Sequence, residues 1–223
     1  MKLSKLAPSQ HVSDRWLLHL ENGELLRVST AQVAEFGLHS GMELTEELLL
    51  ALSAAAREQA LREKALRALE LRPLSRRELV RKLTAPPRKP ADSRKGREAP
   101  PPEPVGPEQA EAVADWLEDL GYLDDGEYAR QVVRHYCAKG YGERKLRDEL
   151  YRRGVPRDLW EAALEEAEPP EDAIDILIRK KMQGADPGDP KALKRTSDAL
   201  ARRGYRWDEI REGLSRYGAE LED

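Results

Sequence analysis

Two stretches of this chain repeat one another, LYRRGVPRDLWEAAL (150–164) and LARRGYRWDEIREGL (200–214), without a gap and at an offset of 50 residues. In both, apolar residues at helical spacing are followed by two arginines, a glycine, an aspartate and a second apolar stripe. This order predicts a helix that ends at the glycine, followed by a helix with an acidic first turn. The coinciding positions are Leu150/Leu200, Arg152/Arg202, Arg153/Arg203, Gly154/Gly204, Asp158/Asp208 and Leu164/Leu214.

A weaker third copy precedes them. RPLSRRELVRKL (72–83) aligns with GYGERKLRDEL (140–150) at an offset of 67, and Ser75 with Glu78 forms a capping-box pattern. The tract 84–107 holds eight prolines where the other copies have a glycine corner, so we expect a disordered insertion there. EQAEAVADWLEDLGYLDD (108–125) then predicts an acidic helix that ends at Gly121.

Each copy also has a leading helix at apolar 3–4 spacing. The predicted fold is therefore mainly α, with three tandem three-helix repeats forming an elongated curved array in which each unit contacts its neighbours. The expected repeats cover 46–125, 126–169 and 170–223. Residues 1–45 differ in kind, because Asn22-Gly23 lies between two apolar runs and predicts a β-hairpin. We expect that hairpin to pair with residues 1–6 or to pack on a short helix capped by Ser29-Thr30.

The charge alternates in phase with the repeat. Residues 134–153 hold seven bases against three acids, whereas 158–175 hold eight acids and no base. One interpretation is a set of solvated faces joined by weak salt bridges. The other is a basic ridge made by the second helices, which suits nucleic acid or an acidic protein surface. The ridge hypothesis nominates these contact residues: Arg76, Arg77, Arg81, Lys82, Arg144, Lys145, Arg147, Arg152, Arg153, Arg202 and Arg203.

Catalytic and metal-binding patterns are not found in the sequence. It contains no nucleophile motif, Walker loop or GxGxxG, and its four histidines lack metal-ligand spacing. We therefore expect no enzyme activity, no metal and no cofactor. The paired acids Asp124-Asp125 are interpreted as helix caps, and most aromatic residues as core, with Tyr141, Tyr205 and Trp207 kept as possible surface contacts. Cys137 is the only cysteine and no apolar run is long enough to span a membrane, so a cytoplasmic location is expected. We also expect a monomer.

The order of these motifs resembles the RecX family, bacterial regulators of the RecA recombinase. The resemblance covers most of the chain: the Asn22-Gly23 hairpin, GLHSG (37–41), RPLSRRELVRKL, GERKLRDELYRRGV and LARRGYRWDEIREGL. LGYLDD (120–125) followed by Tyr128-Ala129 is its most specific part. The tract 84–107 and the loop Asp186–Pro190 depart from the family pattern.

The resemblance implies a protein that binds RecA–single-stranded DNA filaments and inhibits RecA ATP hydrolysis and strand exchange, in recombinational repair and the SOS response. It also implies weak DNA binding by some relatives. The alternative is a stand-alone nucleic-acid-binding protein, because three-helix units with basic second helices look like helix-turn-helix modules. The acidic third helices count against that alternative.

Overall fold

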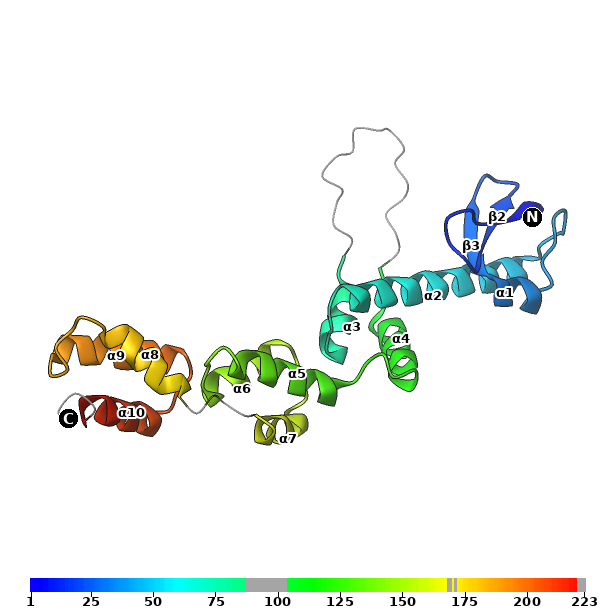
Figure 1. Cartoon of the computed structure of the whole chain (residues 1–223). Helices are drawn as coiled ribbons and strands as arrows, with labels where there is room; N and C mark the ends of the chain where they lie inside the picture. The colour runs from blue at the N-terminus through cyan, green and yellow to red at the C-terminus, as the bar shows by residue number, and fades with distance from the viewer. Residues whose placement is uncertain (87–103, 168–169, 171, 220–223) are drawn as a thin grey trace. The chain divides into compact units, whose positions relative to one another are not determined.

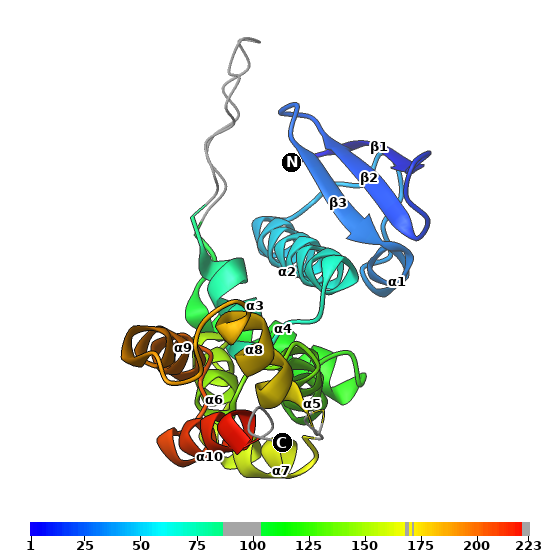
Figure 2. The ribbon, with the colours of Figure 1, turned by 60° about the vertical axis from the view of Figure 1, so that its left-hand side comes forward.

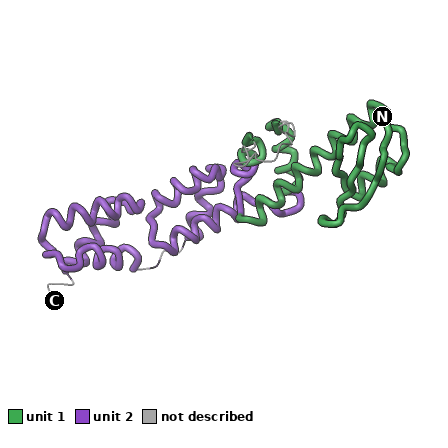
Figure 3. The backbone as a smooth tube through the Cα atoms, turned by 90° about the horizontal axis from the view of Figure 1, so that it is seen from above, with its two compact units in different colours: residues 1–72, 80–117 green, residues 73–79, 118–223 purple. Residues whose placement is uncertain are grey.

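The computed structural model describes residues 1–86, 104–167, 170 and 172–219. The described chain is mainly helical with one small antiparallel sheet, as the sequence predicts (Figure 1). It divides into two compact units, residues 1–72 with 80–117 and residues 73–79 with 118–223 (Figure 3). The elongated, curved arrangement and the repeat boundaries stay predictions. Residues 87–103 of the expected insertion lie outside the described residues, while 84 ends a helix and 107 begins one.

The amino-terminal sheet has the strand order β1-β2-β3 (Figure 2). Its strands are β1 (Leu3–Pro8), β2 (Arg15–Leu20) and β3 (Leu25–Ser29). The hairpin expected at Asn22-Gly23 joins β2 to β3, and Gly23 has φ +85° and donates its N–H to the Leu20 carbonyl at 3.0 Å. β1 pairs with β2, so the expected pairing of the hairpin with the amino-terminal segment is confirmed.

Two helices follow the sheet, α1 (Thr30–Glu35) and α2 (Glu46–Leu71). Ser29 caps α1 through a capping box with Gln32, and Thr45 caps α2. Leu18 and Val28 of the sheet belong to one buried cluster with Leu52 and other α2 residues. This burial of apolar surface against α2 stabilises the small sheet, because an isolated hairpin in water is only marginally stable.

The second half of α2 packs on the carboxyl end of α3 (Arg76–Thr84) and on α4 (Pro107–Asp119). Lys64 Nζ donates to the Leu83 carbonyl at 3.0 Å, and the Arg62 guanidinium lies 4.8 Å from the centre of the Trp116 ring. Because α2 is one unbroken helix, it belongs both to the amino-terminal core and to this helical group.

Two further helical groups make up most of the second unit. The first consists of α5 (Asp125–Cys137), α6 (Glu143–Arg152), η1 (Arg157–Leu159) and α7 (Trp160–Glu165), and the second of α8 (Ala173–Met182), α9 (Pro190–Arg202) and α10 (Trp207–Ala219). Val133, Leu146 and Leu150 centre one buried cluster, and Ile178 and Leu200 centre the other. The acidic helix that follows Gly154 begins with the 3₁₀ turn η1 before it continues as α7, and Trp160 Nε1 donates across this turn to the Val155 carbonyl at 3.0 Å.

Asp124 and Asp125 are both helix caps, as predicted, but they cap different helices. The Asp124 carboxylate accepts the Glu127 N–H of its own helix α5 at 2.8 Å. The Asp125 carboxylate accepts the Arg76 N–H of α3, also at 2.8 Å. Burial raises the pKa of Asp125 although the Arg76 N–H opposes that rise. This pair of caps ties the start of α5 to the start of α3.

Candidate binding surface at the helix junctions

The second helices of the repeats meet end to end. The Arg203 carbonyl, at the carboxyl end of α9, accepts the Gly142 N–H at the amino end of α6 at 3.0 Å. The Gly204 carbonyl accepts the Arg144 N–H at 3.1 Å. Unpaired carbonyls of one helix end thus satisfy unpaired N–H groups of the other, and opposite ends of two helix dipoles meet. We call this contact the α6/α9 junction.

The same contact recurs one repeat earlier. The Ser75 hydroxyl, at the amino end of α3, donates to the carbonyl of Arg153, at the carboxyl end of α6. Arg153 and Arg203 are equivalent positions of the sequence repeat, so the α3/α6 junction is a second copy of the α6/α9 junction. Ser75 also caps α3, because it accepts the Glu78 N–H at 3.1 Å, which confirms the predicted capping box.

The two corner glycines serve both as helix stops and as contact surfaces. Gly154 has φ +72° and Gly204 φ +91°, the left-handed conformation that their sequence position predicts. A Cβ on Gly204 would lie 2.3 Å from the Lys145 backbone nitrogen, and one on Gly154 would lie 2.6 Å from Cδ of Arg77. The second role requires close approach of another helix, which the sequence pattern alone does not reveal.

The amino end of α9 satisfies its own donors. The Asp189 N–H donates to the Asp186 carbonyl at 3.0 Å, and the Lys191 N–H donates to the Asp189 carboxylate at 2.9 Å. Pro190, between them, has no N–H. The Asp186–Pro190 loop therefore supplies locally the acceptors that a neighbouring helix supplies to α6.

The predicted contact residues divide by exposure. Exposed residues are Arg77, Arg81, Lys82, Arg144, Arg152 and Arg202. Half-buried residues are Arg76, Lys145, Arg147, Arg153 and Arg203. Arg81 and Lys82 belong to the first compact unit, whereas the other nine belong to the second unit. Their contact with a partner stays a prediction, but the two classes have different surroundings.

Arg153 sits in a buried polar network. Its guanidinium donates to the Tyr128 hydroxyl at 2.8 Å, and Tyr128 in turn donates to the Glu78 carboxylate at 2.9 Å. Burial alone would lower the pKa of Arg153, but hydrogen bonds with Tyr136 and Tyr128 keep that pKa above its ordinary value. The network connects α3, α5 and α6 behind the α3/α6 junction.

Arg147 and Arg76 form salt bridges with glutamates on neighbouring helices. Arg147 contacts Glu143 at 2.7 Å and holds both carboxylate oxygens of Glu161 on α7, at 2.7 and 3.0 Å. These hydrogen bonds raise the pKa of Arg147. Arg76 donates to Glu118, just before the carboxyl end of α4, at 2.6 Å. Some of the charged residues in the alternating pattern therefore form salt bridges between neighbouring helices.

The three aromatic residues kept as possible contacts also differ in exposure. The Arg203 guanidinium lies 4.7 Å from the centre of the Tyr141 ring, and the Tyr205 hydroxyl donates to the Gly140 carbonyl at 3.0 Å. Both rings are half-buried at the α6/α9 junction. Trp207, by contrast, is 66% exposed. Only Trp207 of the three therefore offers a free ring face.

A groove of about 440 Å³ lies at the α6/α9 junction. Its lining includes Arg144, Lys145 and Asp148 from α6, and Asp198, Ala201 and Arg202 from α9. Neither Arg144 nor Arg202 has an ion pair within the part of the chain that the structure describes. A second groove, on α8 and α9, shares Arg202 and adds two cations that we did not nominate, Lys181 and Arg195. The basic run 179–206 could have indicated them, because both lie within it.

Among the described residues, no group of three metal-binding side chains gathers, and no helix is long and apolar enough to cross a membrane. Cys137 is buried, and burial raises the pKa of its thiol. The junctions and their grooves, which hold exposed arginines, are the candidate binding surface.

Known proteins place the chain in a family. It is 35% identical over 108 residues to the regulatory protein RecX of Vibrio campbellii, an alignment that spans 47% of this chain and 68% of that protein. The chain belongs to the RecX family. The regulatory protein RecX of Xanthomonas axonopodis pv. citri is 37% identical over 109 residues, covering 48% of this chain and 67% of its own length.

Two further comparisons agree with the RecX assignment. The family model described as RecX, second three-helix domain, matches residues 124–164, which hold α5 to α7. A crystal structure of regulatory protein RecX superposes with a TM-score of 0.67 at 20% identity, covering 96% of this chain and 98% of the other. RecX from Lactobacillus salivarius gives a TM-score of 0.55 at 18% identity, covering 71% and 95%. The two crystal structures support the fold of the chain, and the sequence identities to the curated relatives assign it to the family.

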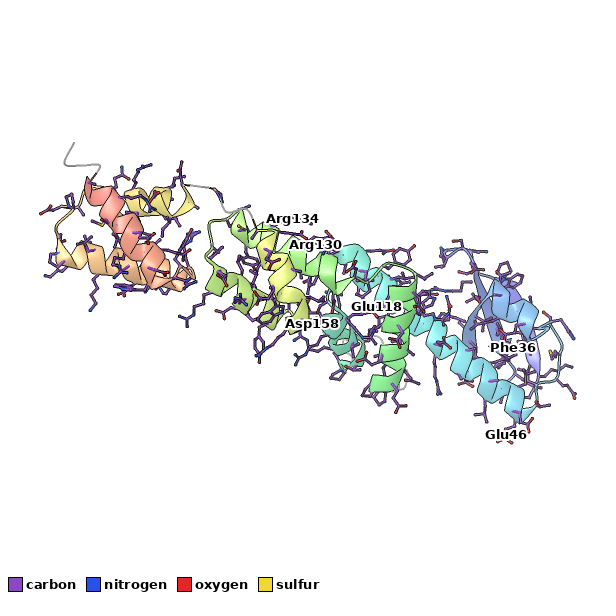
Figure 4. All side chains as sticks on the ribbon, turned by 90° about the horizontal axis from the view of Figure 1, so that it is seen from below. Phe36, Glu46, Glu118, Arg130, Arg134 and Asp158 are labelled. Atoms are coloured by element: carbon purple, nitrogen blue, oxygen red, sulfur yellow. The ribbon has the colours of Figure 1, made fainter. Side chains whose placement is uncertain are left out.

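Acidic residues of the chain make its stability depend on pH. Burial would raise the pKa of Glu149, but hydrogen bonds from Lys145 and Tyr136 hold that pKa below its ordinary value. Hydrogen bonds from Arg130 and Arg134, both on α5 (Figure 4), lower the pKa of Glu127 to about 2. A carboxyl whose folded pKa is depressed stabilises the fold above its unfolded pKa, and that stabilisation is lost as the pH falls through the folded value.

We therefore expect the urea midpoint of unfolding to fall as the pH drops from the ordinary glutamate value of 4.5 towards about 2. Circular dichroism at a series of pH values measures this. Glu149→Gln should flatten the pH dependence, whereas Glu165→Gln, an exposed control on α7, should leave it unchanged. A midpoint that is constant or rises towards acid would contradict this expectation.

Proposed function

We propose that this RecX-family chain regulates RecA by binding the RecA–single-stranded DNA filament, and that it mainly inhibits RecA ATP hydrolysis, strand exchange and filament stability. The proposal rests on family membership, because the relatives are called regulatory protein RecX. Under this proposal the chain acts without catalysis of its own, as a cytoplasmic monomer in recombinational repair and the SOS response.

The junction geometry supports a binding role. Two end-to-end helix contacts present exposed arginines, Arg144 with Arg202 and Arg77 with Arg152, beside structural arginines that hold the helices together. Acidic α7 adds carboxylates beside the basic helix α6, as in the contact of Arg147 with Glu161. A surface of mixed sign suits a partner that presents both protein side chains and DNA phosphate.

Adding the chain to RecA on single-stranded DNA should slow ATP turnover progressively, with the full effect reached at or below one chain per RecA protomer. Each bound chain acts on a filament that hydrolyses ATP only while assembled, so binding that loosens or blocks the filament lowers turnover. A coupled ATPase assay with excess DNA measures the effect, and RecA without DNA gives the background. Unchanged turnover up to one chain per protomer would reject the proposal.

The second candidate is a stand-alone nucleic-acid-binding protein. The match of residues 124–164 to a three-helix domain favours it, because such domains resemble helix-turn-helix modules. In those modules the recognition helix faces the DNA, yet the corresponding helices here have acidic first turns, with Glu161 in α7 and Asp208 in α10. Sub-micromolar DNA affinity without RecA would favour this candidate.

A further inference from the structure

We infer that the two helix junctions are two copies of one binding site for the phosphodiester backbone of single-stranded DNA. In each copy one arginine comes from the amino end of a second helix and the other from the carboxyl end of the next. The inference rests on the proposed function and deepens it, because it assigns these arginines to the DNA of the filament and not to its protein.

The α6/α9 junction carries the better defined copy. Arg144 and Arg202 line the same groove from two helices whose ends are fixed by hydrogen bonds of 3.0 and 3.1 Å. Both side chains are exposed, and no ion pair engages either one among the described residues. The planar guanidinium group matches two phosphate oxygens at once, so it loses less entropy per hydrogen bond than a flexible point cation does.

The α3/α6 junction repeats this arrangement through equivalent residues. Arg77 corresponds to Arg144 at the offset of 67, and Arg152 corresponds to Arg202 at the offset of 50. The stem of Arg77 lies over Gly154, as the backbone of Lys145 lies over Gly204. The Arg152 side chain is 68% exposed and contacts the buried carboxylate of Glu149 at 3.0 Å. Lys145 also pairs with Glu149, at 2.8 Å, so Arg152 can turn to phosphate without leaving that carboxylate unpaired.

Exposed aromatic residues close to the arginines in the sequence favour a single strand as the occupant. Tyr151 is 61% exposed on α6, at the position equivalent to the groove-lining Ala201 of α9. Trp207 is 66% exposed, three residues after Gly204. Unpaired bases stack on such rings while the backbone follows the cations, whereas the bases of a duplex are already stacked on each other.

Two carboxylates limit the strength of the site. Asp148 and Asp198 line the groove together with Arg144 and Arg202, and they occupy equivalent positions at the offset of 50. They repel phosphate and lower the affinity of each copy. Occupation of both copies by one strand raises the overall affinity, because the second contact is then intramolecular. Moderate, salt-sensitive binding of a strand that spans both junctions is the expected behaviour.

Fluorescence anisotropy of a labelled oligothymidylate, titrated with the full chain at several salt concentrations, tests the inference. Arg144→Gln with Arg202→Gln should weaken binding at low salt by about tenfold or more. It should also reduce the slope of log affinity against log salt by about 1.4, since each lost phosphate contact on a single strand contributes about 0.7. Arg77→Gln with Arg152→Gln should act in the same direction, and Tyr151→Ala should weaken binding of the single strand more than that of a duplex.

The matched control is Lys180→Gln with Arg211→Gln, which removes the same charge from exposed positions outside the groove at the α6/α9 junction. The inference is overturned if the control loses as much affinity as the arginine pair, or if the pair changes neither affinity nor slope. It is also overturned if the pair abolishes ATPase inhibition while oligothymidylate binding is unchanged, a result that leaves the proposed function standing. If the chain binds the oligonucleotide through the arginines but leaves RecA turnover unaltered, the proposed function fails and the inference holds.

Discussion

Gly204→Ala should release the α6/α9 junction at a cost of about 3 kcal/mol. A non-glycine residue at φ +91° costs roughly 1–2 kcal/mol, and the new Cβ would lie 2.3 Å from the Lys145 nitrogen, an overlap that adds a similar amount. The Arg144 N–H, bonded to the Gly204 carbonyl at 3.1 Å, should then exchange faster with solvent. Hydrogen exchange followed by mass spectrometry over residues 142–146 measures this.

Alanine substitutions at two other glycines distinguish backbone strain from overlap of the added Cβ. Gly121 has φ +73° with no atom within 4 Å of an added Cβ, so Gly121→Ala should cost only the backbone strain. Gly142 has φ −77°, which alanine adopts freely, but its added Cβ would lie 2.5 Å from the Gly204 carbonyl carbon. Gly142→Ala should therefore speed exchange at the junction without backbone strain. If Gly142→Ala behaves like Gly121→Ala, close packing does not hold the junction.

Arg153→Met should destabilise the second unit by about 2–3 kcal/mol, whereas Arg152→Met should cost less than about 0.5 kcal/mol. The Arg153 guanidinium donates to Tyr128, whose hydroxyl donates to the buried carboxylate of Glu78, so methionine leaves this network without its cation. Arg152 is mostly exposed, and the Glu149 carboxylate that it contacts keeps its salt bridge with Lys145, at 2.8 Å, when Arg152 is replaced.

Urea unfolding followed by far-ultraviolet circular dichroism compares these neighbouring arginines. The pair is well matched, because both substitutions remove one positive charge and keep a long apolar stem. Equal losses of stability would show that Arg153 is not a structural residue. Loss of DNA binding by Arg152→Met without loss of stability would agree with its assignment to the α3/α6 junction site.

Local signals in the sequence were sufficient for many of the elements. Asn22-Gly23 indicates the hairpin, Ser75 with Glu78 indicates the start of α3, and the left-handed glycines 154 and 204 mark the ends of α6 and α9. Each of these depends on a few consecutive residues, so a single sequence is enough. Apolar spacing also indicates a leading helix in the first repeat, which the structure shows as a single helix from Glu46 to Leu71.

The candidate surface needed contacts between distant residues. Arg152 and Arg153 are adjacent and chemically the same, yet only Arg153 reaches Tyr128, 25 positions away. Arg147 belongs to a salt bridge with Glu161 that no periodicity of α6 indicates. The basic ridge was therefore predicted as a set of residues, but its division into structural and exposed arginines was not. The head-to-tail contact of α9 with α6 also lies beyond what repeat spacing reveals.

The cap at Asp189 limits how many modules this architecture can join. At the amino end of α6, the N–H groups of Gly142 and Arg144 donate to carbonyls of the following module, at the end of α9. At the amino end of α9, the N–H groups of Asp189 and Lys191 already donate to Asp186 and Asp189. A further copy added by the same rule would meet a carboxylate where it needs a donor, so lengthening the series would require rewriting this loop with a glycine or a serine.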